Sequence, residues 1–405
     1  MMRIASLCIL ALAGVAGYIQ IDSRPPWVPF AMPAALEFEQ PVPEVTAPVA
    51  GKKPQISTQV SIPEPRAQFI PETAAPSVHA GSAILLNDGN LRAFWFAGSR
   101  EGATDVVIQT AVLDAKAGNW GNPEVVIDRV ATEKGLSRYI KKLGNPLPVR
   151  SSQGKLQLYF VTVSVGGWAG SSISWIESGD EGVSWSRPQR LITSPALNLS
   201  TLIKAPGFEF TDGTLGLPVY HEWMGKFGEL IRVDGGRVID KRRMSSGRAL
   251  LQPIVFIDTP EKAVAYFRQA RSAGPPRIAS ALTENAGQSW VGGVDLDFPN
   301  PNAAIAGLQL SNGDRLIALN DLESGRYRLV LAIAPAGTSN WNVIAEVEYD
   351  QTLINGLHRE FSYPSLLLGA NGEVHLIYTY DRKKMKHIQF DPRWIESKKN
   401  QKGSS

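Results

Sequence analysis

Short apolar runs separated by turn-forming residues dominate the chain after residue 73. Six times, an apolar run is followed by a tight turn and a second apolar run, as in the segment 83–96 around Asp88-Gly89. The other turns are centred on Gln153-Gly154, Asp212-Gly213, Thr259-Pro260, Asn312-Gly313 and Asn371-Gly372. Asp-Gly and Asn-Gly between such runs are strong signals of a β-hairpin. Successive turns lie 65, 59, 47, 53 and 59 residues apart, which leaves room for about four strands in each of six units.

An eight-residue pattern occurs twice and marks the same place in two of these units. Ser178–Trp185 returns as Thr283–Trp290, and both copies read hydroxyl, any, Asp or Asn, any, Gly, any, any, Trp. The hydroxyl and the Asp or Asn can satisfy N–H groups of a turn, the Gly can adopt positive φ, and the Trp can fold back as a hydrophobic plug. Weaker copies occur at 114–120 and 334–341. The pattern predicts a turn that pins two strands together, and it carries no obvious catalytic group.

The repeat of strand pair, third strand and Trp-bearing turn predicts an all-β fold, a six-bladed β-propeller of four-stranded antiparallel blades. A β-sandwich is the alternative for an all-β chain, but it gives no reason for such a repeat. The sixth unit has only three strands, at 363–368, 374–380 and 385–390. We therefore expect an N-terminal segment within 55–70 to supply its outermost strand and close the ring. The predicted propeller spans 73–392 and leaves a polar tail at 393–405.

The first 21 residues predict a secretion signal or a membrane anchor. Arg3 precedes a largely apolar run, 4–19, which is shorter than a typical membrane span. Residues 22–72 contain many prolines among small and polar residues, which is typical of an extended tether. Cys8 is the only cysteine, so a mature chain without the signal would contain no disulfide. The sequence predicts an exported protein, periplasmic or extracellular, that is anchored to the inner membrane if the apolar run is retained.

Charge and metal-ligand patterns argue against several classes of function. The chain has 41 Lys and Arg against 38 Asp and Glu, which gives no nucleic-acid signature. The basic cluster Arg382-Lys383-Lys384 is interpreted as solvated surface. The five histidines lie far apart, only His221-Glu222 forms a close pair with a carboxylate, and no glycine-rich phosphate loop is present. We expect no metal and no cofactor.

The Trp-bearing turn resembles the Asp box, or BNR repeat, of the sialidase (neuraminidase) superfamily, whose propellers also have six blades. The resemblance covers about 75–392, and the segments 98–106, 299–302 and 362–364 resemble the bacterial proteins called predicted sialidases. The Asp box alone is evidence of fold, since it also occurs in propellers of other activity. The resemblance implies a glycan ligand, three arginines that bind its carboxylate, an aspartate acid/base, and a tyrosine nucleophile activated by a glutamate.

Three of these roles match residues of this chain by the resemblance. Arg268 matches the second carboxylate-binding arginine, and Tyr363 matches the nucleophile. Arg326 matches the third arginine, with Arg328 as the alternative. Guanidinium groups suit this role because their planar forks pair bidentately with a carboxylate. The other interpretation is structural, with inter-blade ion pairs for the arginines and a channel-lining position for the tyrosine.

Two positions depart from the family pattern. His79 stands where the first arginine is expected, and Gln252, sixteen residues before Arg268, stands in place of the activating glutamate. Gln252 cannot accept the proton of a tyrosine as a carboxylate does. His79 can act as a general acid or base near neutral pH, which suits a polysaccharide lyase or a histidine-dependent glycosidase on the same fold. The structural interpretation of His79 is a hydrogen-bonded core residue.

Carboxylates near the start of the first unit are candidates for the acid/base role that the resemblance implies. Asp105 is the preferred one and Glu101 the second, in the loop that begins at Arg100. Either has a structural interpretation as the ion-pair partner of Arg100. Glu222 and Glu360 are weaker candidates because carboxylates at strand ends are commonly solvated.

Innermost strands of a propeller converge on the axis, so residues distant in sequence are expected to form one site. The residues grouped there are His79, Asn145, Lys204, His221, Gln252, Arg268, Asn300, Asn302, Arg326 and Tyr363. Arg268, Arg326, Arg100, Gln252 and Asn300 are the predicted substrate-binding residues, with Trp168 as a sugar-stacking platform. The sequence predicts an exo-acting glycoside hydrolase of the sialidase type acting on an acidic sugar. The alternatives are a lyase or histidine-dependent glycosidase, and a non-catalytic glycan-binding protein of surface-polysaccharide metabolism.

Overall fold

The structure is a computed structural model that describes residues 27–32, 62–194, 197–247, 249–270 and 274–403, together with Cys8 and Leu12. The predicted signal or anchor at 1–21 lies outside these residues, apart from those two. Within the described part of the chain, no helix has both the length and the apolar character that crossing a membrane requires.

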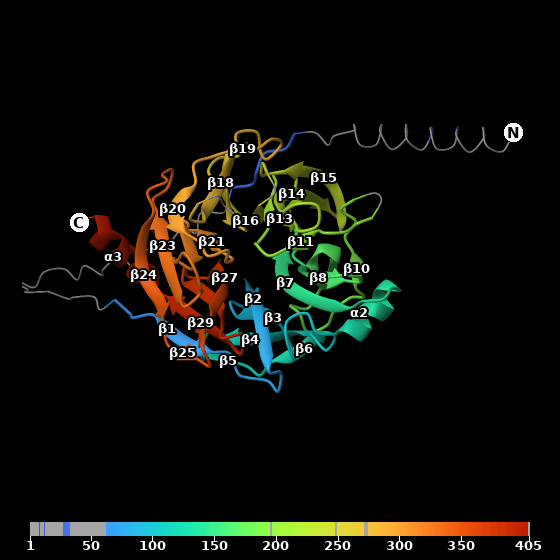
Figure 1. The fold of residues 1–405 in the computed structure, drawn as a ribbon, viewed down its shortest axis with the longest axis horizontal. Coiled ribbons are helices and arrows are strands. Elements are labelled where there is room, and N and C mark those ends of the chain that lie inside the picture. Colours follow the sequence, from blue (N-terminus) through green and yellow to red (C-terminus); the bar gives the residue numbers. More distant parts are fainter. Residues whose placement is uncertain are drawn as a thin grey trace, which may run out of the picture.

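The strands form six antiparallel sheets arranged around one axis in chain order (Figure 1). Blade one consists of β2 (Ser77–Leu85), β3 (Leu91–Gly98), β4 (Val107–Asp114) and β5 (Asn119–Trp120), with β6 (Glu124–Ile127) also paired to β4. Blade two consists of β7 (Lys142–Arg150), β8 (Leu156–Val163), β9 (Ser171–Ser178) and β10 (Gln189–Arg190). Blade three consists of β11 (Leu202–Ile203), β13 (Leu215–His221), β14 (Phe227–Asp234) and β15 (Arg237–Arg243), with β12 (Phe208–Glu209) also paired to β13.

The remaining blades repeat this order. Blade four consists of β16 (Leu250–Ile257), β17 (Ala263–Gln269), β18 (Arg277–Thr283) and β19 (Val291–Gly292), with β20 (Leu296–Pro299) paired to β18. Blade five consists of β21 (Ala306–Gln309), β22 (Arg315–Leu319), β23 (Arg328–Ala334) and β24 (Asn342–Tyr349). Blade six consists of β27 (Phe361–Leu368), β28 (Val374–Tyr380), β29 (Lys384–Phe390) and the N-terminal β1 (Arg66–Phe69), and a small hairpin of β25 (Leu353–Ile354) and β26 (Leu357–His358) precedes it. The predicted six-bladed propeller is confirmed.

The ring is closed by strands from opposite ends of the chain. β1 pairs antiparallel with β29, so that Gln68 lies opposite His387. Two buried histidines support this junction, since His375 Nδ1 and His387 Nε2 lie 2.9 Å apart and the indole of Trp120 in blade one donates to His387 Nδ1 at 3.2 Å. Burial lowers the pKa of His375 to about 4 and that of His387 to about 3, so both rings are neutral at neutral pH. β1 lies within the segment 55–70 for which this closing role is predicted.

Burial explains why the strands form sheets that pack face to face. Every residue of β3 and of β8 is buried, because the second strand of a blade is covered by neighbouring blades on both faces. The outermost strand β15 instead contains only exposed and half-buried residues. The apolar clusters join consecutive blades, as where Phe94 of blade one and Phe160 of blade two share a cluster. The core is therefore a ring of inter-blade layers.

The two copies of the eight-residue pattern form matching turns between the third and fourth strands of blades two and four. In the first copy, Ser178 Oγ accepts a hydrogen bond from Gly182 N, and Asp180 Oδ1 accepts one from Ser184 N, both at 2.8 Å. Gly182 has φ +89°, a conformation that side chains rarely allow. The second copy repeats these contacts with Thr283, Gly287, Asn285 and Ser289. The predicted turn is confirmed at both places.

Two α-helices within residues 62–403 lie outside the blades. α2 (Arg129–Leu136) connects blade one to blade two, and Asp128 caps it by accepting a hydrogen bond from Ala131 N at 2.6 Å. α3 (Pro392–Gly403) falls on residues predicted to be a polar tail. Trp394 and Ile395 in its first turn are 7% and 2% exposed and belong to the cluster between blades five and six. Two apolar side chains thus dock a segment that is otherwise polar.

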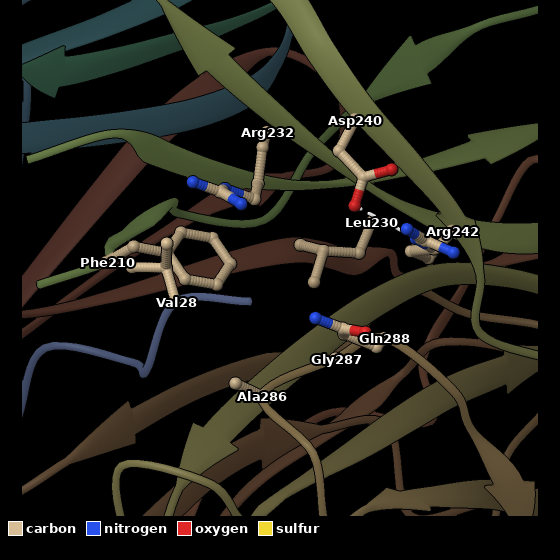
Figure 2. Close-up of a pocket in the computed structure, with 9 residues that line it drawn as sticks. All are labelled: Val28, Phe210, Leu230, Arg232, Asp240, Arg242, Ala286, Gly287 and Gln288. Atoms are coloured by element: carbon tan, nitrogen blue, oxygen red, sulfur yellow. Dashed lines mark hydrogen bonds and ion pairs between the residues drawn. The ribbon is translucent and has the colours of Figure 1, made fainter. Parts of the chain in front are cut away.

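Part of the proline-rich segment predicted to be an extended tether is docked on the propeller. Residues 27–32 lie between blades three and four, where Phe30 is fully buried 5.3 Å from the ring of Phe210. Phe30 N donates to Pro260 O of blade four at 2.8 Å. A small gap of about 10 Å³ is left beside this segment. Figure 2 shows the residues that line it, among them Val28 and the second Trp-bearing turn at 286–288. The segment therefore fills the groove between these blades almost completely.

Candidate functional site

The innermost strands of four blades are interrupted at the same place. In β2, β7, β16 and β27 a β-bulge sets two residues opposite one, and the first of the two has positive φ. These residues are Ala80 (+55°), Asn145 (+42°), Gln252 (+50°) and Tyr363 (+53°). In each of these blades the residue with positive φ stands nine positions before an equivalent residue of the hairpin turn that joins the first two strands. The turn residues are Gly89, Gly154, Glu261 and Gly372. Left-handed backbone at a residue other than glycine costs about 1–3 kcal/mol, so four blades carry the same backbone strain at this end of the axis. We call it the bulge end, and the opposite end the turn end.

Contacts between blades that are not neighbours place these residues at the axis. Gln252 of blade four donates from Nε2 to Tyr363 Oη of blade six at 3.3 Å. Lys204, which stands nine residues before Gly213 in blade three, donates from Nζ to the carbonyl of Pro364 in blade six at 3.0 Å. Blades that are not adjacent meet only around the axis. The structure therefore brings Lys204, Gln252 and Tyr363 together.

Arg268 fixes the orientation of the Gln252 amide. Arg268 Nη1 donates to Gln252 Oε1 at 3.1 Å, and Arg268 Nε donates to Asn302 Oδ1 at 2.6 Å. The amide nitrogen of Gln252 consequently faces the hydroxyls of Tyr363 and Tyr220, each at 3.3 Å. Gln252 thus gives a hydrogen bond to the tyrosine oxygen, whereas a glutamate would accept one. This contact can stabilise negative charge on the oxygen of Tyr363 but cannot remove its proton.

Lys204 places a buried cation beside this tyrosine. Its side chain is 8% exposed, and its ammonium lies 5.8 Å from the ring centre of Tyr363. Among the described residues, its only hydrogen-bond acceptor is the Pro364 carbonyl, and no carboxylate pairs with it. Burial lowers the pKa of Lys204 to about 8. The bulge end therefore carries a cationic group that loses its charge in mildly alkaline solution.

His79 lies beneath Tyr363, with ring centres 4.2 Å apart. It is 1% exposed, and neither ring nitrogen has a hydrogen-bond partner among the described residues. Burial, followed by the charge of Arg382, holds the pKa of His79 well below its usual value. The imidazole is therefore neutral and covered. The structural interpretation of His79 as a hydrogen-bonded core residue is half right, because it is buried but not hydrogen-bonded.

Glu360 joins two arginines beside this group. It accepts from Arg326 Nη1 at 3.2 Å, from Arg382 Nε at 2.8 Å and from Ser362 Oγ at 2.6 Å. Burial raises the pKa of Glu360, but these hydrogen bonds and charges outweigh it and lower the pKa to about 2. Arg382 Nη1 also donates to Glu101 Oε2 at 2.5 Å. The interpretation of Arg382 as solvated surface is corrected, because the turn between β28 and β29 holds it against these carboxylates.

The bulge end thus combines cationic side chains with hydrogen-bond donors. Arg268, Arg326, Arg382 and Lys204 are set against the carboxylates Glu101 and Glu360. An excess of positive charge beside a tyrosine hydroxyl suits an anionic ligand. Within the described residues no group of three or more His, Cys, Asp or Glu side chains is arranged to hold a metal ion.

The family is shown by a sequence comparison that covers most of the propeller. A family model described as "BNR repeat-like domain" matches residues 89–376. The chain belongs to this family. A comparison with curated protein sequences gives no match.

Solved structures share the BNR propeller fold at low sequence identity. The Hadza microbial sialidase Hz136 has a TM-score of 0.63 at 15% identity, with 78% of this chain and 66% of that chain covered. A protein of unknown function from Dyadobacter fermentans has a TM-score of 0.65 at 12% identity, with 82% of this chain and 100% of that chain covered. The Trypanosoma rangeli sialidase in complex with sialic acid has a TM-score of 0.61 at 12% identity, with 83% of this chain and 60% of that chain covered. At these identities the likeness shows the fold alone.

Several predicted site residues of the BNR propeller lie at the edge of the bulge end or are engaged elsewhere. Asp105 is exposed and accepts hydrogen bonds from Ser99 N and Oγ at 3.0 and 2.9 Å. Arg100 is exposed and pairs with neither predicted carboxylate. Asn300 is fully buried, and among the described residues its side-chain amide bonds only to the backbone of Ala303 in its own loop.

Three further residues are held within single blades. Trp168 lies against Gly144, and Lys142 Nζ stands 3.8 Å above the indole, so one face of this predicted stacking platform is already covered. His221 lies 2.5 Å from Glu229 Oε2 and stacks on Phe227, which ties it to the hairpin of β13 and β14. Glu222 Nα donates to Ser200 Oγ at the end of the same hairpin.

Tyr220 and Arg382 take part in the site of the BNR propeller but are absent from the predicted set. Tyr220 ends an apolar strand with no distinguishing pattern, and Arg382 is hidden in a basic cluster. The bulges themselves have a usable signal. Proline follows the strained residue in three of the four bulges, at Asn145-Pro146, Gln252-Pro253 and Tyr363-Pro364.

Proposed function

We propose that this protein is a sialidase-like exo-glycoside hydrolase that acts on an acidic sugar. The observation that carries the proposal is the convergence of Arg268, Arg326 and Tyr363 from blades four, five and six at the bulge end. Arg268 keeps Nη2 without an acceptor among the described residues, so it can still bind a ligand carboxylate. A tyrosine suits attack on an anionic sugar, because a carboxylate nucleophile would be repelled.

The proposed roles follow from these contacts. Tyr363 Oη forms the bond to the anomeric carbon and gives up its proton to solvent, which returns it when the sugar is released. The glycosidic bond breaks in the same step, and the leaving oxygen takes a proton from a carboxylic acid. Asp105 is preferred over Glu101 for this step, because Glu101 is bound to Arg382 whereas Asp105 is exposed and held only by Ser99. Water then releases the sugar from the tyrosine, with the same carboxylate acting as base.

One observation favours a second function, a glycan-binding protein without turnover. No described carboxylate accepts the hydroxyl proton of Tyr363, because Gln252 presents its amide nitrogen there. The same arrangement leaves an anion-binding surface intact. A lyase that uses His79 as its base is less well supported, since that imidazole is buried beneath Tyr363.

A panel of oligosaccharides that end in carboxylated sugars tests the proposal. Incubation with the wild-type protein and with His79→Ala is followed by mass spectrometry of the products. The hydrolase should release a saturated monosaccharide, and a lyase should instead release an unsaturated uronide that absorbs in the ultraviolet. Binding by calorimetry that survives Tyr363→Phe, with no product from any substrate, would support the glycan-binding function. The absence of both binding and turnover across the whole panel would refute both functions.

We further propose that the protein is exported, as the apolar run at 4–19 suggests. Fractionation of cells that express the full chain with a C-terminal tag tests this. Recovery of the tagged protein with the cytoplasmic fraction would contradict it, and recovery with the membrane would support retention of the run as an anchor.

A further inference from the structure

One loop between blades four and five contacts both of the arginines that converge at the bulge end. It comprises residues 299–303, Pro-Asn-Pro-Asn-Ala, between β20 and β21. Arg268 Nε of blade four donates to Asn302 Oδ1 at 2.6 Å, and Arg326 Nη2 of blade five donates to the carbonyl oxygen of Asn302 at 3.2 Å. A side-chain oxygen and a main-chain oxygen of one residue therefore hold two guanidinium groups from different blades.

The loop itself is fixed by its own hydrogen bonds and by the core. The side-chain amide of the fully buried Asn300 accepts from Ala303 N at 3.0 Å and donates to Ala303 O at 3.2 Å. Asn300 N donates to the carbonyl of Pro276 at 3.0 Å, and Asn302 N donates to Asn300 O at 2.8 Å. Ile305, just after the loop, is 2% exposed and belongs to the apolar cluster between blades four and five. The position of Asn302 is thus set relative to both blades.

The backbone at Asn302 is left-handed, with φ +54°. Glycine adopts this conformation readily, whereas other residues are disfavoured there and asparagine is among those that tolerate it best. Glycine at this position would keep the carbonyl that binds Arg326, but it would leave Arg268 Nε without its acceptor. Backbone geometry alone therefore favours glycine, and the contact with Arg268 accounts for the asparagine side chain.

The two contacts determine which guanidinium nitrogens remain for a ligand. Arg268 uses Nε for Asn302 and Nη1 for Gln252, and Arg326 uses Nη2 for Asn302 and Nη1 for Glu360. Among the described residues, neither Arg268 Nη2 nor Arg326 Nε has an acceptor. A guanidinium group is planar, so holding two of its nitrogens also fixes the direction of the remaining N–H groups.

We propose that Asn302 is a positioning residue that sets the orientation of Arg268 and Arg326 as a pair for the carboxylate of an acidic sugar. This inference rests on the proposed function, which assigns the anionic ligand to these two arginines. Without the side chain of Asn302, Arg268 keeps its charge and its contact with Gln252 but loses the second contact that fixes its plane. The loss therefore affects recognition of a planar carboxylate more than general attraction to an anion.

Asn302→Gly tests this, because it removes the Arg268 contact and keeps both the carbonyl and the left-handed backbone of residue 302. In calorimetric titrations, affinity for sialic acid should fall about 10-fold, while affinity for its methyl ester should change little. Asn355→Gly is the matched control, since Asn355 has φ +53° at the exposed turn of the β25–β26 hairpin. The control should change neither affinity. The melting temperatures of the two variants should be alike, because both place glycine in left-handed backbone.

The exchange of the Arg268 Nε proton with water gives a measurement without ligand. In the NMR spectrum of protein made with isotope-labelled arginine, this signal is identified by its absence from Arg268→Gln. Loss of the hydrogen bond to Asn302 should make exchange about 10-fold faster in Asn302→Gly than in the wild type. Asn355→Gly should exchange at the wild-type rate.

Two results would overturn the inference. One is an unchanged affinity for sialic acid in Asn302→Gly. The other is an equal loss of affinity for acid and ester together with a lower melting temperature than Asn355→Gly, which would make the role of Asn302 purely structural. If the wild type does not bind sialic acid, proton exchange decides alone: an unchanged rate in Asn302→Gly overturns the inference, and a faster rate supports it. Failure of the proposed function is recognised separately, by the absence of binding and turnover across the panel of acidic oligosaccharides.

Discussion

The two ends of the propeller axis are built by different means. At the turn end, hydrogen bonds join residues that are close in sequence, as where Gly182 N donates to Ser178 Oγ four residues away. At the bulge end, contacts join residues that are far apart in the sequence, with a separation of 160 positions from Lys204 to Pro364 and of 111 from Gln252 to Tyr363. The turn end is therefore made of repeated local units, and the bulge end is made once by the whole ring.

The difference separates the part that stabilises the fold from the part that can carry chemistry. The Trp-bearing turns satisfy their own polar groups locally, with positive φ at Gly182 and Gly287 and at the residue before each, Glu181 and Ala286. The bulge end places Gln252 and Tyr363 in left-handed backbone. Among the residues that the structure describes, the buried His79 side chain has no hydrogen bond and the buried Lys204 ammonium has no carboxylate partner. Such features destabilise a protein, and they persist where the surrounding structure holds them for function.

The largest effect is expected for Arg268→Gln at the bulge end. The substitution removes the positive charge at position 268 and the hydrogen bond to Asn302. Affinity for a carboxylated sugar should therefore fall about 100-fold, while affinity for the methyl ester of the same sugar should change little. Calorimetric titration of both ligands measures this. Arg277→Gln in the same blade, which is paired with Asp297, is the matched control. Equal losses for acid and ester would show that Arg268 does not recognise the carboxylate.

Arg382→Gln should have the next largest effect. Its guanidinium is bound by Glu101 and Glu360 and adds positive charge beside Arg326. We expect about 10-fold weaker binding of the acid than in the wild type, again with little change for the ester. Arg359→Gln removes a neighbouring arginine that pairs with Asp381 and should leave the acid-to-ester ratio unchanged. If the ratio of acid affinity to ester affinity is unchanged in Arg382→Gln, the role of Arg382 is purely structural.

Ser178→Ala tests the turn end. It removes the acceptor of Gly182 N and should lower the free energy of unfolding by about 1 kcal/mol, measured by chemical denaturation. Ligand affinity at the bulge end should not change. Ser339→Ala, in a weak copy of the turn where Ser339 is exposed, is the control and should have little effect. A change in glycan affinity in Ser178→Ala would show that the two ends are coupled.

The pH dependence of binding should show the smallest effect. The pKa of Lys204 is lowered to about 8, so its ammonium is charged below that pH and neutral above it. Attraction to an anionic ligand is present at low pH and is lost as the pH rises through 8, which should weaken binding about 3-fold between pH 7 and pH 9. Lys204→Met should bind more weakly at pH 7 and lack this decline. An equal decline in both proteins would assign it to another group.

The fold could be predicted because its signals are local. Asp88-Gly89 identifies a hairpin through two adjacent residues, and each Trp-bearing turn is identified by residues within one octapeptide. Six turns of the first kind are enough to count the blades. The missing strand of blade six also follows from counting, although only the structure identifies it as Arg66–Phe69. The docking of residues 27–32 and of α3 depends on grooves that exist only once the blades are assembled.

The bulge end could be predicted only in part, because its contacts also form only once the blades are assembled. Position in a repeat shows that Tyr363 and Gln252 approach the axis, but not which way the Gln252 amide points, since Arg268 decides that. The residue type of His79 alone suggests a general acid or base. Its burial beneath Tyr363 arises only when the six blades pack together. Arg382 reaches the site through the turn between β28 and β29, and its neighbours in sequence carry no sign of this.

The pairing of β1 with β29 also sets the order in which the chain can be completed. Gln68 emerges from the ribosome early, yet its partner His387 is made 319 residues later. Until then the first strand has no partner, and blade one lacks its neighbour in blade six. Closure is therefore a late, long-range event, and a chain truncated before residue 384 would remain an open arc with unpaired strand edges. Pairing of β1 therefore requires that the chain has been made through β29 (Lys384–Phe390).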